Sequence, residues 1–244
     1  MSIIPNLVLL FAFTTIQNPI VEAYPDAIVN ISNNKVVFNS GEKLLYDDFK
    51  KKSTQELLDY PDIEDQLKYQ YNQGAQIYNT DAGRIRNELF FKTLYGKTKN
   101  DVVKNLKTLT WCPKLVNKQI QFNTQNGAYN ALKSVSEELD KHVEWKKYLE
   151  NISGTFNWRY ISGTKRLSAH SFGITIDLNT KYSNYWQWDS GSTHENAKII
   201  YKNQIPLELV AIFEKNGFIW GGRWKHYDTM HFEYRPEILL KKLK

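Results

Sequence analysis

Short β-like runs around a single helix restrict the fold of this chain more than any other feature. After Ser153-Gly154 the sequence contains the runs TFNWRYI, GITIDLN, GFIWGG and MHFEYRPE. The segment IPLELVAIFEKNGF lies among them and has the pattern of a helix, with a proline in its first turn and Gly217 at its end. Strands and helices mixed in this way predict an α+β fold whose functional half covers residues 150–238.

The first half of the chain predicts smaller elements of both kinds. NISNNKVVFN has the pattern of a hairpin with Asn-Asn at its turn, and residues 47–80 that of one or two short helices in an extended region. Apolar spacings predict helices within residues 81–106 and, most clearly, over residues 128–149, with a strand, a turn at Pro113 and a second extended segment between them. No stretch rich in Pro, Gly or Ser marks a boundary between two independent domains.

Composition excludes several classes of protein. The 244 residues are 41% hydrophobic, which is enough for a packed core. Lys and Arg total 32 against 26 Asp and Glu, but the excess of +6 is spread along the chain, so we expect no nucleic-acid partner. The single cysteine, Cys112, cannot form an internal disulfide or a Cys-rich zinc finger, and its apolar, proline-bounded setting favours a buried free thiol over a catalytic one.

The N-terminal 23 residues have features of an export signal. Their apolar run from Leu7 to Phe13 is too short to span a bilayer, and Val21-Glu22-Ala23 offers small residues at the positions that a signal peptidase reads. No Lys or Arg precedes the run, which leaves a buried strand as the alternative. We expect an exported chain that lacks a stable membrane span once residues 1–23 are removed.

Three side chains from two of the β-like runs have the chemistry of a metal site. In GITIDL a strand directs Asp177 away from the apolar layer, and in MHFEY the same alternation separates His231 from its apolar neighbours. His170 comes from the turn before the first strand. A catalytic zinc typically has three protein ligands and one open position, and nitrogen and carboxylate oxygen ligands suffice.

Two carboxylates close to His231 in the sequence are candidates for the base that would take a proton from a zinc-activated water. Asp228 lies three residues before His231 and is our first candidate, while Glu233 competes for this role or orients a ligand histidine. On spacing alone, a buried strand with two hydrogen-bonded polar residues is the favoured interpretation, because a histidine at a strand end is usually only hydrogen-bonded. A serine hydrolase built on Ser168 and His170 fits poorly, because no nucleophile elbow surrounds the serine and no third member is apparent.

Two motifs resemble the zinc peptidases of the M15 family, which cut peptides containing D-amino acids in bacterial cell walls. SAHSFGITIDLN is similar to their Ser-x-His-x-x-x-Gly-x-x-x-Asp-like signature through Ser168, His170, Gly173 and Asp177. WGGRWKHYDTMHFEYRPE resembles the second half of the site in the endolysin-like branch, with Asp-x-x-His where other branches use Glu-x-x-His. DAGRIRNELFFKTLYG also resembles an N-terminal extension of that branch.

The resemblance implies a role for each matching residue. His170, Asp177 and His231 would hold Zn²⁺, and Asp228 would be the general base. Arg159 matches the arginine that binds the substrate or stabilises the developing oxyanion, a task that suits a permanently charged, bidentate guanidinium. The residue-level alternative for Arg159 is an ordinary surface strand residue.

The resemblance also implies a fold and a domain plan. We expect a small antiparallel sheet that carries the zinc site between flanking helices, as in the peptidase fold shared with hedgehog proteins, together with a mostly helical N-terminal extension. The expected units are a signal peptide (1–23), an extension packed on the core (24–125) and the zinc peptidase domain (126–244). Ser168 would hydrogen-bond the substrate, unless it is only a turn serine.

The implied function is a zinc metallopeptidase acting on peptidoglycan stem peptides. It would be a D-Ala-D-Ala carboxypeptidase or an L-Ala-D-Glu endopeptidase that acts as a monomer in the periplasm, the cell wall or outside the cell. The alternative is a non-catalytic wall-binding module that retains the fold. His194 and His226 lie outside the expected triad, and we predict that both face solvent.

Overall fold

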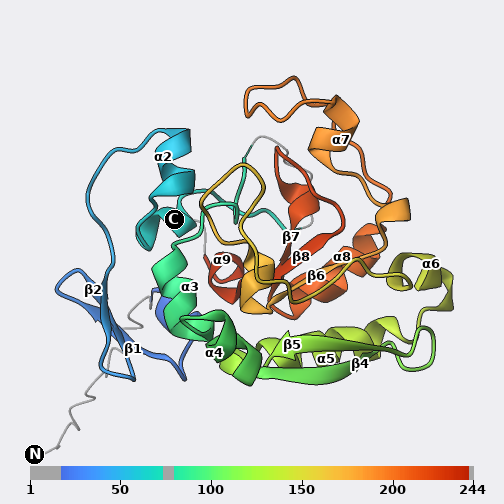
Figure 1. Ribbon diagram of the computed structural model, residues 1–244, viewed down its shortest axis with the longest axis horizontal. Helices are drawn as coiled ribbons and strands as arrows, with labels where there is room; N and C mark the ends of the chain where they lie inside the picture. The colour runs from blue at the N-terminus through green and yellow to red at the C-terminus, as the bar shows by residue number, and fades with distance from the viewer. Residues whose placement is uncertain (1–17, 74–79, 242–244) are drawn as a thin grey trace, which may run out of the picture.

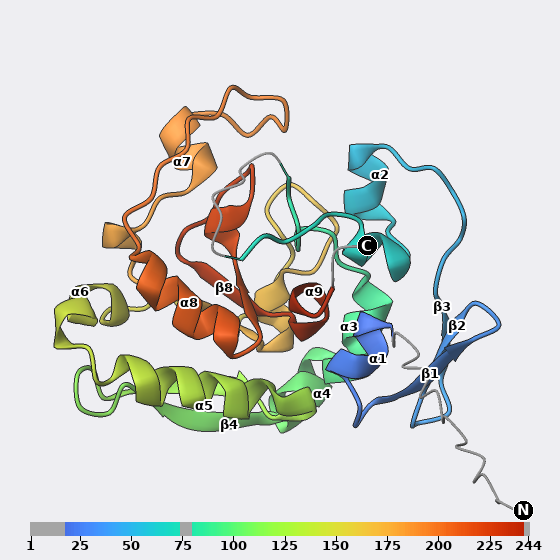
Figure 2. The ribbon, with the colours of Figure 1, turned by 180° about the vertical axis from the view of Figure 1, so that it is seen from behind.

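The computed structural model describes residues 18–73 and 80–241, which Figures 1 and 2 show from opposite sides. The apolar run of the predicted leader lies outside these ranges. The end of the leader forms helix α1 (Pro19–Ala23), in which Ile20 and Val21 are buried against the rest of the chain. Cleavage after Ala23 would therefore remove a helix that belongs to the core.

The N-terminal region contains two small antiparallel sheets as well as short helices. The first sheet has the order β1-β2-β3, and the second pairs β4 with β5. Its strands and helices are β1 (Ile28–Ser32), β2 (Lys35–Phe38), β3 (Lys43–Leu45), α2 (Thr54–Asp59), the 3-10 helix η1 (Glu64–Leu67), α3 (Glu88–Tyr95), α4 (Lys99–Lys104), β4 (Leu106–Trp111) and β5 (Lys118–Asn123). The expectation of a mostly helical extension did not allow for these sheets.

The predicted hairpin near residue 33 is confirmed, and its turn explains the asparagines. Ser32 pairs with Lys35 in the β1–β2 register, so the loop is only two residues long. Asn33 and Asn34 have φ angles of 49° and 57°, the left-handed values that a two-residue turn of this kind requires and that asparagine tolerates. The predicted pair of extended segments around Pro113 is likewise present as β4 and β5.

The C-terminal region is built on a third antiparallel sheet with the order β6-β8-β7. In sequence order its elements, with the turns that precede them, are η2 (Gln125–Gly127), α5 (Ala128–Leu139), η3 (Val143–Trp145), α6 (Lys146–Leu149), η4 (Ala169–Phe172), β6 (Thr175–Asp177), η5 (Thr180–Tyr182), α7 (Trp186–Ser190), α8 (Leu207–Lys215), β7 (Phe218–Trp220), η6 (Gly221–Arg223), β8 (His231–Tyr234) and α9 (Pro236–Leu239). Mixed helices and small antiparallel sheets confirm the α+β class.

Two predictions for this region need correction. The helix expected over residues 128–149 is interrupted after Leu139, because the amides of Lys114 and Leu115 bind the carboxylate of Asp140 and fix it at the end of α5. TFNWRYI forms no regular strand and contributes only the isolated bridge between Tyr160 and Leu167. This run therefore lies at the edge of the site as a loop.

The helices connect the sheets into a layered core. α8 packs on β7 and on α5, and α5 in turn covers β4 and β5 (Figure 2). The rings of Phe213 on α8 and Phe232 on β8 stack with their centroids 3.9 Å apart. One continuous hydrophobic cluster extends from Ile20 in α1 to Phe232, so the N-terminal region and the β6-β8-β7 sheet share a core. Among the described helices, none has both the length and the apolar character needed to cross a bilayer.

Candidate metal centre

The three predicted metal ligands meet at the edge of the β6-β8-β7 sheet. Asp177 lies directly opposite His231 in the register of β6 and β8, and η4 supplies His170. The carboxylate of Asp177 contacts both rings, with Oδ2 3.0 Å from Nε2 of His170 and Oδ1 3.0 Å from Nδ1 of His231. One ligand atom from each residue lies within 4.8 Å of the other two. Two imidazole nitrogens and one carboxylate oxygen thus converge as the sequence predicts.

Local backbone geometry explains why the signature has Ser168 and Gly173 around His170. The hydroxyl of Ser168 accepts a hydrogen bond from the backbone N–H of His170 and caps η4. Gly173 ends η4 with a φ of 66°, and a Cβ atom at this position would come within 2.6 Å of Leu106. The sharp turn that delivers His170 to β6 therefore needs both residues.

The outer nitrogen of each ligand histidine has a fixed partner. Nδ1 of His170 donates to the carbonyl oxygen of Thr155 at 2.7 Å, which leaves Nε2 to face Asp177. Nε2 of His231 lies 3.3 Å from Glu233, so Nδ1 faces the centre. Such partners select the tautomer and orient the ring for a metal. Glu233 thus takes the orienting role that we considered as its alternative.

A buried charge network holds Glu233 in place. Its side chain is 0% exposed and accepts from Arg86 at 2.9 Å and from Arg235 at 3.3 Å. Arg235 continues to Glu237, which accepts from the hydroxyl of Tyr24 at 2.6 Å. Burial acts to raise the pKa of Glu233, but the Arg86 charge and the His231 hydrogen bond outweigh it and lower the pKa to about 2. Glu233 is therefore ionised.

Asp228 has the setting expected of a base. It lies on the turn before β8, and its Oδ1 is buried with no hydrogen-bond partner among the described residues. Burial, followed by the negative charge of Asp177, raises the pKa of Asp228 to about 7. A carboxyl group that titrates near neutrality can both accept and return a proton.

Asp177 and His231 carry opposite charges that stabilise each other. Burial opposes ionisation of Asp177, yet the charges and hydrogen bonds of His170 and His231 hold its pKa far below the usual range. Burial lowers the pKa of His231, but the hydrogen bonds to Asp177 and Glu233 and the charge of Asp177 outweigh this and raise it to about 10. A cation that replaces the histidine proton would meet the same negative surroundings.

The structure does not bring Arg159 into the triad. Its side chain is exposed, and its guanidinium donates to the carbonyl of Tyr160 at 3.4 Å. Ser168 is 5% exposed, and its hydroxyl serves the η4 cap. The alternatives that the sequence left open for both residues, a surface residue and a turn serine, match these positions.

Sequence reasoning missed the contributions of residues 81–86. We predicted a solvent-facing His226, but it is 3% exposed, with Nδ1 2.7 Å from Asp81 and Nε2 2.8 Å from the carbonyl of Glu195. Arg86, which holds Glu233, comes from the same distant segment. The alternating Arg-x-Arg of DAGRIRNEL was the only signal of this contact, and a single sequence does not reveal its partner.

A comparison with known protein families finds a match to part of the chain. A sequence model described as D-alanyl-D-alanine carboxypeptidase matches residues 162–234. Residues 162–234 are therefore similar to the M15 peptidase family, and we call them the M15 segment. This M15 segment contains the triad and Asp228, whereas Thr155, Arg86 and Arg159 lie outside it. No curated protein and no solved structure matches the chain.

Proposed function

We propose that the chain is a zinc-dependent metallopeptidase that hydrolyses peptide bonds in peptidoglycan stem peptides. The observation that carries the proposal is the unpaired, buried Oδ1 of Asp228 beside a cluster of two imidazoles and one carboxylate. An oriented donor set with an unpaired carboxylate at its side is what metal-assisted hydrolysis needs. The M15 segment supports the choice of peptide substrates.

The donor set fits zinc. His170, Asp177 and His231 would supply two nitrogen ligands and one oxygen ligand, and the Thr155 carbonyl and Glu233 already support the two rings. When bound, zinc supplies a Lewis acid that polarises the scissile carbonyl and lowers the pKa of a water molecule.

Asp228 then accepts and returns the proton. Asp228 takes one proton from the attacking water while the water oxygen bonds to the carbonyl carbon, and returns the proton to the amine nitrogen as the C–N bond breaks. Its pKa of about 7 permits both transfers near neutral pH. We keep Arg159 as the proposed substrate-binding cation, because its exposed guanidinium is accessible to a peptide.

Digestion of purified peptidoglycan with the zinc-loaded protein tests the function and separates its two forms. Released D-Ala, detected by mass spectrometry, identifies a carboxypeptidase, and cleaved L-Ala-D-Glu bonds identify an endopeptidase. A wall-binding module would cleave neither and would need no stoichiometric zinc, so metal analysis of the same sample accompanies the digestion. Intact wall together with absent zinc would reject the proposal.

The proposed function also implies a cellular location. We propose that the chain is exported to the periplasm, the cell wall or the medium, and that its N-terminal residues direct this export. Because Ile20 and Val21 are buried, the position of the cut matters. N-terminal sequencing of the exported protein decides whether α1 remains in the mature chain.

A further inference from the structure

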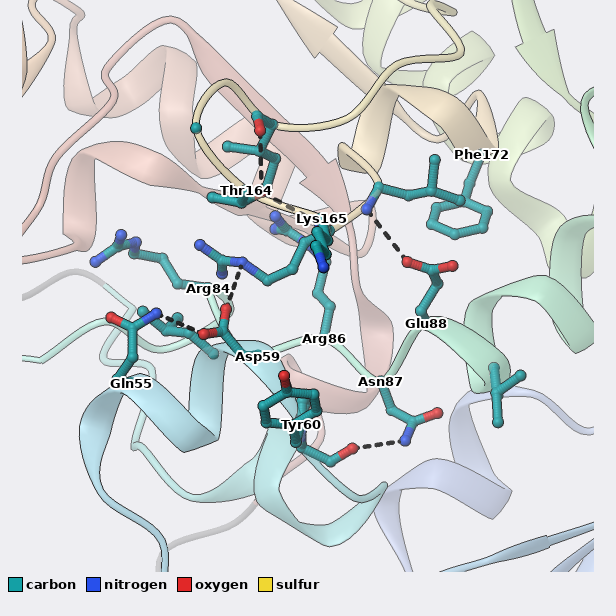
Figure 3. Close-up of a pocket in the computed structure, with 17 residues that line it drawn as sticks. Gln55, Asp59, Tyr60, Arg84, Arg86, Asn87, Glu88, Thr164, Lys165 and Phe172 are labelled. Carbon is teal, nitrogen blue, oxygen red and sulfur yellow. Dashed lines mark hydrogen bonds and ion pairs between the residues drawn. The ribbon is translucent and has the colours of Figure 1, made fainter.

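A cavity of about 790 Å³ lies between the N-terminal region and the M15 segment. One wall comes from α2 and the segment that enters α3, and the other from the loop 161–167 (Figure 3). Figure 3 shows Gln55 and Asp59 on the first wall and Thr164 on the second. A volume in this range accommodates a small ligand or a short peptide fragment.

The two walls are fixed to each other by direct bonds. The backbone N–H of Leu167 donates to the carboxylate of Glu88 at 3.2 Å, at the start of α3. Asp59 on α2 forms an ion pair with Nε of Arg166 at 3.4 Å and also accepts from Gln55 at 2.7 Å. The cavity is thus a built feature of the contact between the two regions.

Two residues that line the cavity also belong to the surroundings of the candidate metal centre. Phe172 lines it and belongs to η4, the same short helix that carries His170. Arg86 also lines it and binds Glu233, which orients His231. For cleavage, a peptide bound in the cavity would have to extend from these shared residues to the triad.

The cavity is basic, and its cations differ in how far they are neutralised. Arg84 is paired with Asp81 and Glu195, and Arg86 with the buried Glu233. Lys165 is exposed and has no ion pair with a described residue. Among the described residues, the side chain of Arg166 has only the ion pair of its Nε with Asp59, and that Nε has no hydrogen-bond partner. Two adjacent cations thus remain available to an anion.

We propose that this cavity is a substrate subsite that binds a free carboxylate of the peptide through Arg166 and Lys165. The inference rests on the proposed peptidase function and adds to it a requirement for negative charge on the substrate. A guanidinium binds a carboxylate with two parallel hydrogen bonds, and Asp59 at Nε would hold it in orientation. Because α2 and the segment before α3 form one wall, the N-terminal region takes part in substrate choice.

Stem peptides that differ only in amidation test the subsite. One peptide has both the α-carboxylate of D-Glu and the C-terminal carboxylate free, and two others have one or the other amidated. With zinc-loaded protein we expect one amidation to raise KM by about 10- to 100-fold, the loss typical of a charged hydrogen bond. The arm that responds identifies the carboxylate.

Variants of the two cations test whether the effect of amidation on KM arises in the cavity. Arg166→Gln should raise KM for the free peptide by a similar factor and leave the amidated peptide unchanged, and the exposed Lys165→Gln should act in the same direction without a risk to folding. Lys133→Gln on α5 removes the same charge far from the cavity and should leave the discrimination intact. Equal cleavage of all three peptides, or equal losses on all of them in Arg166→Gln and Lys165→Gln, would overturn the proposal.

Calorimetric binding separates this proposal from the proposed function. Asp228→Ala, titrated with the three peptides, reports affinity without turnover. Discrimination in binding with no cleavage by the wild type would support the subsite and reject the peptidase. Cleavage by the wild type without any discrimination would support the peptidase and reject the subsite.

Discussion

A change at Arg86 tests whether the residues around the proposed ligands are needed for metal binding, without altering a ligand itself. It is the residue of the N-terminal region that reaches Glu233, at 2.9 Å, and Glu233 reaches Nε2 of His231 at 3.3 Å. Arg86→Gln removes the charge and keeps a hydrogen-bonding side chain. Within the described part of the chain, the fully buried Glu233 would keep only Arg235, at 3.3 Å, as its cationic partner besides His231.

We expect Arg86→Gln to lower both the stability of the protein and its affinity for zinc. Breaking a buried ion pair costs about 3–5 kcal/mol, and the remaining Arg235 places the expected loss near the lower limit, about 3 kcal/mol. For a chain of this size that loss lowers Tm by roughly 6–12 °C. Loss of a group that supports a ligand histidine typically weakens metal binding by about 10- to 100-fold.

Competition with a chromophoric zinc chelator measures the affinity, and thermal melting in excess chelator measures the stability of the metal-free protein. Arg84→Gln is the matched control, because Arg84 pairs with Asp81 and Glu195 and has no contact with Glu233. It should lower Tm and leave zinc affinity unchanged, and Arg86→Lys should recover part of the affinity. Zinc affinity of Arg86→Gln within twofold of wild type would refute the positioning argument.

The proposed base, a proposed ligand and the turn before β6 give three more predictions. Asp228→Ala should retain zinc and lose turnover, whereas His231→Ala should lose both; full metal content in His231→Ala would contradict its role as a ligand. The pKa of Asp228 is raised to about 7, so ionisation costs the metal-free protein stability as pH rises from about 4 to 7. Asp228→Asn should therefore raise the metal-free Tm by several degrees at pH 8 and by little at pH 4, and a difference that does not depend on pH would argue against this cause. Gly173→Ala should lower stability by about 1–3 kcal/mol, measured by urea unfolding, because its φ is 66° and Leu106 blocks the methyl group; an unchanged midpoint would show that the turn adapts.

Short-range patterns predicted the parts of the fold that depend on neighbouring residues. Alternation in GITIDL and MHFEY predicted β6 and β8, and with them the direction of Asp177 and His231. The positions of Pro206 and Gly217 predicted α8, which begins directly after the proline and ends at Lys215, two residues before the glycine. These features are local, so one sequence is sufficient to find them.

The elements that the sequence left out depend on distant contacts. Asp140 ends α5 because it binds backbone amides 25 and 26 residues earlier, and no feature of the helix itself shows this. His226 is buried because Asp81, 145 residues away, accepts from its ring. Charged and polar residues have an exposed position as their default, and only a partner in space overrides it.

The difference between local patterns and distant contacts also explains which residues of the site could be predicted from the sequence. The proposed ligands and the proposed base lie in two short motifs within the M15 segment, whereas Thr155 and Arg86, which support them, lie outside it. A polar partner is needed because a buried carboxylate such as Glu233 is costly unless it is paired. Arg86 satisfies Glu233, Glu233 orients His231, and the same stretch forms one wall of the basic cavity. The N-terminal region is therefore part of the proposed site, and residues 162–234 alone would lack both the charge that supports one proposed ligand and half of the proposed subsite.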